Sequence, residues 1–140
     1  MNSNQEKIQA LLTFLVADQN YKIEPALKVD LEIFKDRGFK NEVDKNVIDQ
    51  LSDLYEVANG FEYEMIIGFY SCNDEIIFQN WLEKELFLGK KDFNVLRWKN
   101  NKFCLGDNIG NTSISEDYEF DTLIELIECC INEIREIESC

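Results

Sequence analysis

The sequence contains no histidine in 140 residues, and this absence removes several functional classes. Histidine is the commonest general base near neutral pH and the commonest metal ligand in proteins. Ser–His and Cys–His catalytic pairs and histidine-ligated metal centres are therefore excluded. Carboxylate pairs, lysine and tyrosine remain as reactive groups, but no arrangement of them stands out. We expect a protein that is not an enzyme and that uses no cofactor or metal ion.

The cysteines lack the pattern of a disulfide framework or a zinc site. Their number is odd and no Cys-x-x-Cys motif occurs. Disulfide frameworks use regular pairs, and zinc sites usually contain at least one closely spaced pair. We interpret most of them as small core residues and keep a redox or metal role as the less favoured alternative. The five are Cys72, Cys104, Cys129, Cys130 and Cys140.

Long apolar segments are missing as well. No run is long enough to span a bilayer, and the N-terminal MNSNQEKIQ lacks the basic start and apolar block of a secretory signal. We therefore expect a cytoplasmic protein without membrane contacts. A length of 140 residues, of which 45% are hydrophobic, is enough to bury one core. The expected organisation is a single domain over residues 1–140, with N-terminal helices over 4–38 and a central helix, sheet and closing helix over 43–138.

Acidic residues dominate what is present, with 28 Asp and Glu against 14 Lys and Arg. The net charge of −14 exceeds the magnitude of roughly 2 to 8 that keeps a small domain soluble. Such a charge repels nucleic acid and anionic membranes and attracts basic proteins over long range. Solubility and recognition of a basic partner are both consistent with it, and the sequence favours neither.

The charges are also unevenly distributed along the chain. Six basic residues lie between Lys84 and Lys102, whereas nine acidic residues and one basic residue lie between Glu116 and Glu138. One interpretation is that both are ordinary solvated faces. The sharper one is a local anionic surface for a cationic partner. A Ca²⁺ site is disfavoured, because the D-x-D-x-D-G pattern of a calcium loop does not occur.

Hydrophobic periodicity predicts three amphipathic helices. The first covers about Asn4 to Asp18 and begins with a Ser3–Glu6 capping box. The central helix runs from Val47 to Ala58 and ends at Asn59-Gly60, and the closing helix runs from about Asp121 to Ile137. Residues 21–38 fit either a strand or a helix. We choose a helix that has Pro25 at its start and Gly38 at its end.

Short apolar runs bounded by turn residues predict the sheet. The expected strands are 65–70, 93–98, 102–105 and 112–115, with Asn100-Asn101 as a hairpin turn. Between the first two strands we expect a helix that is capped by Asn73 or Asp74 and extends to Leu88. The predicted fold class is α+β, a mostly antiparallel sheet of about four or more strands with helices packed against it.

Four segments resemble the SUKH superfamily. Leu54–Glu62 resembles its helix-ending Asn-Gly segment, and Phe69–Ser71 with Asp74–Ile77 resembles the strand and helix that follow there. Phe103–Asn108 occupies the place of a sheet strand and turn, and Tyr118–Ile124 resembles the start of the closing helix. The resemblance extends from about Val43 to Ile134. It implies an α+β domain without catalytic residues. Bacterial members bind and neutralise polymorphic toxins, often nucleases, and other members are interaction modules.

The leading hypothesis is an immunity protein that binds a basic, nuclease-type toxin through an acidic surface and binds no nucleic acid. The alternative is a general protein-interaction module without a toxin partner. An enzyme that uses Glu62 and Glu64 as paired carboxylates is a third, weaker hypothesis. Trp81 is either a partner contact or an anchor within the fold. The candidate contact residues are Glu62, Glu64, Asp74, Glu75, Trp81, Glu83, Asp107, Glu116, Asp117 and Glu119.

Overall fold

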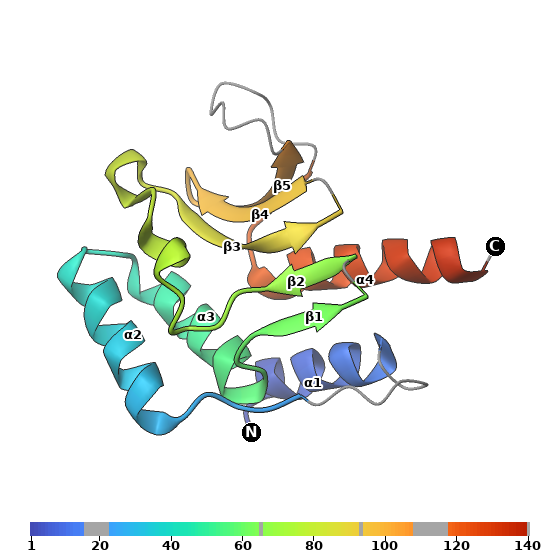
Figure 1. Ribbon diagram of the computed structural model, residues 1–140, viewed down its shortest axis with the longest axis horizontal. Coiled ribbons are helices and arrows are strands. Elements are labelled where there is room, and N and C mark those ends of the chain that lie inside the picture. Colours follow the sequence, from blue (N-terminus) through green and yellow to red (C-terminus); the bar gives the residue numbers. More distant parts are fainter. Residues whose placement is uncertain (16–22, 65, 93, 108–117, 140) are drawn as a thin grey trace.

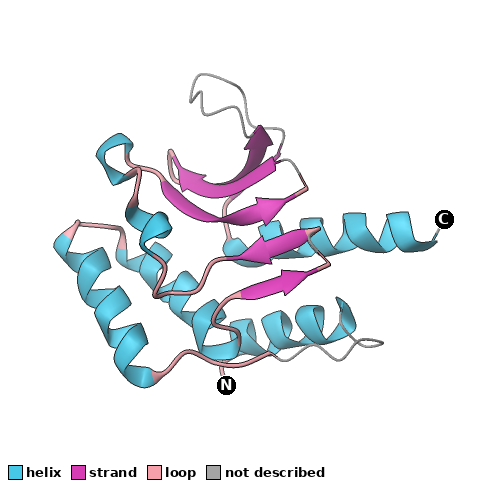
Figure 2. Ribbon diagram, viewed as in Figure 1, coloured by secondary structure: helices cyan, strands magenta, loops and turns pink. Residues whose placement is uncertain are grey.

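Helices cover one face of an antiparallel sheet, which confirms the α+β class (Figures 1 and 2). The computed structural model describes residues 1–15, 23–64, 66–92, 94–107 and 118–139. Its helices are α1 (Ser3–Leu15), α2 (Lys28–Lys40), α3 (Lys45–Val57), η1 (Glu75–Phe78), η2 (Trp81–Glu83) and α4 (Leu123–Ser139), where η denotes a 3-10 helix. Its strands are β1 (Phe61–Tyr63), β2 (Ile67–Phe69), β3 (Leu86–Lys91), β4 (Asn94–Lys99), β5 (Lys102–Asp107) and β6 (Tyr118–Phe120).

The described strands form one sheet in chain order, from β1 to β6, and all neighbours are antiparallel. Antiparallel strands need no crossover helix, and only the connection from β2 to β3 among the described ones is long, since it contains η1 and η2. The predicted turn between β4 and β5 is confirmed. Asn100 and Asn101 have φ values of 52° and 63°, a left-handed pair that suits a tight hairpin and that asparagine tolerates.

The two faces of the sheet differ because side chains alternate along each strand. Phe61 and Phe69 lie opposite each other in the register and belong to the core with the helices. Glu62, Gly68 and Lys90 are aligned across β1, β2 and β3 on the opposite face. The core therefore lies between the sheet and the helices, and the other face near β1 and β2 carries polar and small residues.

The predicted amphipathic helix α3 is present, and its apolar face is buried. Its N-terminus is capped by Asp44, whose Oδ1 accepts a hydrogen bond of 2.8 Å from the Asn46 N–H. Helices α1 and α2 both pack against α3, and α1 also contacts α4. The Phe34 ring of α2 meets Tyr55 edge-to-face, with centroids 5.1 Å apart.

The cap of α1 is displaced by one residue from the prediction. Asn2 Oδ1 accepts from the Gln5 N–H at 2.8 Å, and Gln5 Oε1 accepts from the Asn2 N–H at 3.0 Å. This is the reciprocal geometry of a capping box, built from Asn and Gln instead of the predicted Ser3 and Glu6. Gln5 also donates to Glu56 of α3, so the cap ties the two helices together.

The choice of a helix for residues 21–38 is correct for its second half, but both proposed ends are wrong. Pro25 precedes α2, which begins at Lys28. Gly38 lies inside α2 and is buried. A Cβ at Gly38 would lie 2.7 Å from Cδ1 of Ile48 in α3, so this glycine permits close packing of two helices. It does not end the helix.

The helix predicted from residue 73 or 74 to Leu88 is wrong. Asp74 does act as a cap, with Oδ1 accepting from the Ile76 N–H at 3.1 Å, but it starts only the short helix η1. Lys84 adopts a left-handed φ of 60° after η2, and the chain then enters strand β3. Leu86 and Leu88 are buried in the sheet. Pairing with β2 and β4 therefore decides the conformation of this apolar run.

Two further strands need comment, of which the first was missed and the second was predicted. Strand β1 was not predicted, because three residues give too short an alternation to detect. The strand expected at residues 112–115 lies outside the described residues.

Candidate functional site

The predicted contact residues do not form one patch. Glu62 and Glu119 are exposed on β1 and β6, which are the two edges of the described sheet. Glu75 and Glu83 are exposed on η1 and η2. Glu116, Asp117 and the side chain of Asp107 lie outside the described structure. The acidic residues thus lie on several parts of the surface.

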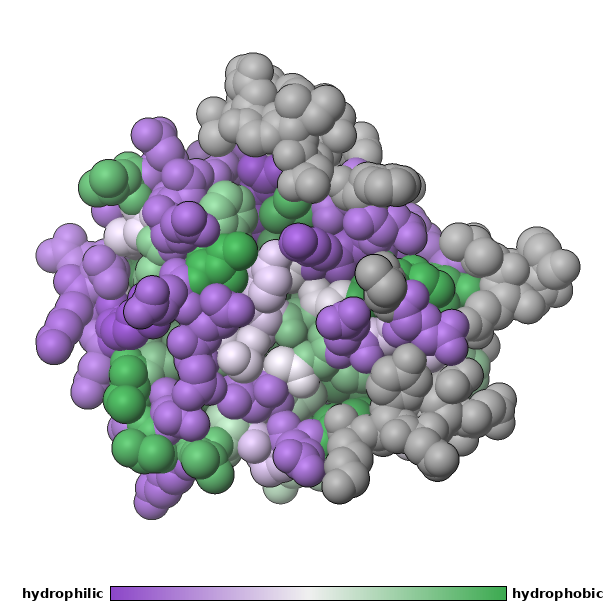
Figure 3. Space-filling view, viewed as in Figure 1, coloured by the Kyte–Doolittle hydropathy of each residue, from purple (hydrophilic) through white to green (hydrophobic). Residues whose placement is uncertain are grey.

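Glu62 and Asp74 do come together, at a depression that we call the sheet-side hollow. It has a volume of about 680 Å³ and lies against β1 and β2. Figure 3 shows the molecule in the same view as Figure 1, with pale residues of intermediate hydropathy at its centre and hydrophilic residues around them. The lining residues that matter below are Glu62, Gly68, Tyr70, Asp74, Lys90 and Asp92.

Gly68 makes the hollow possible. It lies between Glu62 and Lys90 in the cross-strand register, and it has no side chain to fill the space between them. Strands β2 and β3 also approach closely here. A Cβ at Gly89 would lie 2.0 Å from the Gly68 carbonyl oxygen, so only glycine fits at that position. Gly68 therefore leaves its backbone bare in the lining of the hollow, and the buried Gly89 lets β3 lie close behind it.

The electrostatics of the sheet-side hollow favour a cation. Its lining contains the carboxylates of Glu62, Asp74 and Asp92 and the ammonium group of Lys90. The Asp92 carboxylate also pairs with the buried Lys91, whose Nζ lies 3.5 Å from Asp92 Oδ2. Burial, and then the charge of Asp74, raise the pKa of Tyr70. Its hydroxyl therefore stays protonated near neutral pH and is available as a hydrogen-bond donor. The arrangement suits a lysine or arginine side chain accompanied by a polar acceptor.

Sequence reasoning missed Asp92, whose position depends on the turn after β3. Asp92 has a left-handed φ of 54° directly after β3, a conformation that aspartate adopts more readily than most residues. A turn at this point would have placed Asp92 beside β2. That inference requires β3, which the sequence pattern did not reveal.

The basic run between Lys84 and Lys102 is largely used within the fold. Lys91 is buried, and its Nζ lies 2.6 Å from Glu133 Oε2 on α4. Glu85 is also buried, and its Oε1 lies 3.5 Å from a guanidinium nitrogen of Arg97 and 3.8 Å from Nζ of Lys99. Three of the six basic residues are therefore not part of a solvated basic face, and the sequence interpretation of such a face is wrong for them.

Trp81 is held by contacts within the chain. Its ring stacks on Trp98 with centroids 6.3 Å apart, and Nε1 donates to the Asn41 carbonyl at 2.9 Å. The Nζ atom of Lys84 lies 4.8 Å from the centre of the ring. These contacts support the interpretation of Trp81 as an anchor that holds η2 against the sheet and the α2–α3 connection.

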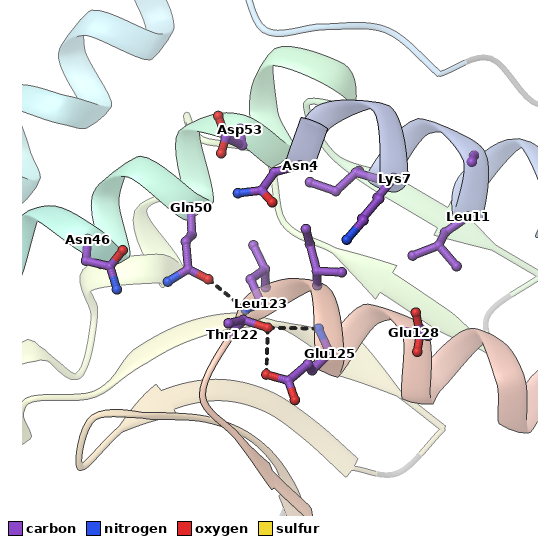
Figure 4. A pocket seen from close by; sticks show the side chains of 13 residues that line it. Asn4, Lys7, Leu11, Asn46, Gln50, Asp53, Thr122, Leu123, Glu125 and Glu128 are labelled. Carbon is purple, nitrogen blue, oxygen red and sulfur yellow. Dashed lines mark hydrogen bonds between the residues drawn. The ribbon is translucent and has the colours of Figure 1, made fainter. Parts of the chain in front are cut away.

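A second depression, which we call the helix groove, was not predicted. It has a volume of about 660 Å³ and is bounded by α1, α3 and α4 (Figure 4). It shares no lining residue with the sheet-side hollow. Its walls come from three separate parts of the chain, so no local motif announces it.

Comparison of the chain with protein-family models, curated proteins and solved structures finds no match. The resemblance to the SUKH superfamily therefore stays a prediction. No helix in the described residues is long and apolar enough to cross a membrane. Within the same residues, no group of three or more Cys, Asp or Glu side chains is placed to hold a metal ion. Cys72, Cys104, Cys129 and Cys130 are free thiols.

Proposed function

We propose that this protein is a non-catalytic immunity protein that neutralises a cognate basic toxin, and that the sheet-side hollow forms part of the contact. The observation that carries the proposal is that Glu62, Asp74 and Asp92 line one depression together with the bare backbone of Gly68. A toxin that acts on nucleic acid presents lysine and arginine side chains to phosphate groups. The same side chains are complementary to this hollow.

Overall charge supports the same interpretation. A net charge of −14 attracts a basic protein before contact and raises the rate of productive encounter. The hollow then offers a specific place for one cationic side chain. Covering the basic surface of a toxin blocks its access to nucleic acid without any covalent step.

The enzyme hypothesis loses its structural premise. It relied on Glu62 and Glu64 facing the same side of one strand. Strand β1 ends at Tyr63, and Glu64 lies in the following turn with a left-handed φ of 47°. The two carboxylates therefore do not follow the alternation of a single strand, and the spacing argument for a catalytic pair fails.

Co-expression with the toxin encoded immediately upstream tests the proposal. Growth rescue and a purified complex are expected, and the absence of both would refute it. Glu62→Lys reverses a charge on an exposed strand residue. Asp74→Asn removes a charge, whereas the new side chain still accepts the hydrogen bond that caps η1. We expect each variant to weaken binding about tenfold, which corresponds to about 1.4 kcal/mol.

The matched control is Glu32→Lys, a charge reversal at an exposed position of α2 that is not part of the hollow. It should leave the affinity within about twofold of wild type. A complex that tolerates both hollow variants would assign the contact to another surface. A partner that is recovered by pull-down and is not the neighbouring gene product would favour the alternative, a general interaction module.

A further inference from the structure

The helix groove is built from aligned rows of side chains on three helices. Asn4, Lys7 and Leu11 form one wall on α1, and α3 contributes Asn46, Gln50 and Asp53. Thr122, Leu123, Glu125 and Glu128 form the other wall at the start of α4. On α1 and α3 the spacing of three or four residues places the side chains of each row on one helix face, whereas the third row begins with the adjacent residues Thr122 and Leu123. Figure 4 shows these rows facing one another across the groove.

Hydrogen bonds hold the groove in shape. Gln50 Oε1 accepts from the Leu123 N–H at 2.9 Å, which fixes the start of α4 on α3. Asn2 Nδ2 donates to Asp53 at 2.9 Å, which fixes the start of α1 on the same helix. Thr122 caps α4 by accepting from the Glu125 N–H at 3.3 Å. A ligand therefore meets a preformed site and orders little of the protein on binding.

The lining combines an apolar floor with a mostly acidic rim. Ile8 and Leu123 are buried at the base, whereas Leu11 and Ile124 are half-buried and reachable. The charged rim residues are Lys7, Asp53, Glu125 and Glu128, three carboxylates and one ammonium group. An apolar centre inside a polar rim is the usual anatomy of a protein-binding surface.

We infer that the helix groove binds a basic amphipathic helix of another protein. An extended segment is disfavoured, because the walls are helices whose backbone groups already bond within the helix and offer no strand partner. In a bound helix the backbone N–H and C=O groups bond to each other, so the helix needs only side-chain contacts with the groove. Its apolar face meets Leu11 and Ile124, and its lysine or arginine residues meet Glu125, Glu128 and Asp53.

A second copy of this chain is the wrong occupant on electrostatic grounds. Each copy carries a net charge of −14, so two copies repel each other before contact. The inference goes beyond the proposed function, because a helix in the groove leaves the sheet-side hollow free. One protein molecule therefore has room for two different partners at once.

The test uses an 18-residue synthetic peptide with leucines along one helical face and lysines elsewhere. Its control is a peptide of identical composition in scrambled order, which has the same charge and no apolar face. Binding to the full-length protein is measured by fluorescence anisotropy and mapped by amide chemical shifts. We expect the amphipathic peptide to bind about tenfold more tightly than the scrambled one and to shift amides of α1, α3 and the start of α4.

Protein variants complete the test. Glu128→Lys, at an exposed rim position, should weaken binding of the amphipathic peptide about fivefold, and Glu32→Lys on α2 should change it less than twofold. Equal binding of both peptides, or equal weakening by both variants, would reduce the effect to net charge and overturn the inference. Shifts centred on Gly68 and Asp92, or self-association that changes the groove amides, would also overturn it.

Discussion

Lys91 is a basic residue on the core side of the sheet, and its neighbours explain how it is tolerated there. Its Nζ lies 2.6 Å from Glu133 Oε2 and 3.5 Å from Asp92 Oδ2. Burial lowers the pKa of Lys91, but the hydrogen bond and charge of Glu133, with the charge of Asp92, together raise the pKa above the ordinary lysine value. The lysine therefore stays charged and fastens α4 to the end of β3.

Removing the carboxylate of Glu133 should destabilise the protein more than removing the lysine. Glu133→Gln leaves a buried ammonium group with only the longer contact to Asp92, at a cost of about 2 kcal/mol. Lys91→Met leaves a carboxylate that is partly solvated, and it should cost less. Urea unfolding at pH 7 measures the free energy of unfolding of both variants. The control is Glu128→Gln at an exposed position, whose free energy of unfolding should lie within about 0.5 kcal/mol of wild type. A larger loss for Lys91→Met would contradict the argument.

The same pair sets a pH dependence. A lysine whose pKa is raised in the folded state contributes its full stability below the pKa of the unfolded state. That contribution is lost as the pH rises through the folded value. We expect the difference in unfolding free energy between wild type and Glu133→Gln to stay constant from pH 7 to about 9 and to shrink above about 10.4. A difference that already declines between pH 7 and 8 would implicate another group.

At the scale of secondary-structure elements, the packing of α2 against α3 depends on Gly38. In Gly38→Ala the new Cβ would meet Ile48 Cδ1 at 2.7 Å, and the crowding should cost about 1 kcal/mol after the gain in helix propensity. Ile48→Val removes that Cδ1 atom and alone should cost about 1 kcal/mol. The double variant should lose less unfolding free energy than the sum of the losses of the two single variants. Strict additivity in chemical unfolding would show that the two side chains do not meet.

The pairing of β2 with β3 gives a second prediction at this scale. Gly89→Ala places a methyl group 2.0 Å from a backbone oxygen, which cannot move unless the strands separate, so we expect a loss of about 3 kcal/mol or more. Gly68→Ala is the matched control, because its Cβ would have no neighbour closer than 3.4 Å. It should retain wild-type stability within about 1 kcal/mol in thermal unfolding. Similar losses for both variants would contradict the close approach at Gly89.

At the element scale, sequence patterns predict what is local and miss what depends on pairing. Helices α1, α3 and α4 follow from periodicity, and the turn at Asn100 and Asn101 follows from residue preference. Strand β3 was mistaken for helix because its apolar run fits both conformations until β2 and β4 lie beside it. Gly38 was mistaken for a helix end because its contact with Ile48 depends on how α2 packs against α3, which the sequence does not show.

The candidate sites show the same limit. Acidic composition identified Glu62 and Asp74, but their meeting at one hollow depends on the register of β1 and β2 and on η1. Asp92 joins them only through β3. The helix groove needs three helices in a fixed arrangement, and its residues look like ordinary solvated positions in the sequence. A site formed by elements far apart in the chain has no local signature.

At the scale of the whole molecule, the net charge of −14 should destabilise the folded state through self-repulsion. Screening shortens the range of this repulsion, since the Debye length falls from about 30 Å at 0.01 M salt to about 10 Å at 0.1 M. The Lys91 and Glu85 ion pairs are buried and therefore much less screened. We expect the unfolding free energy to rise by about 1 kcal/mol between these two salt concentrations.

Thermal unfolding of the free protein in 0.01 M and 0.1 M NaCl measures this effect. Sucrose at equal osmolality is the control, because it strengthens burial by exclusion and does not screen charge. A variant with Glu6→Lys and Glu32→Lys, both at exposed helix positions, reduces the net charge and should respond less to salt. If added NaCl lowers stability instead, exposed pairs such as Lys45–Asp49, 2.7 Å apart, outweigh the repulsion. The net charge would then not destabilise the free protein, contrary to this prediction.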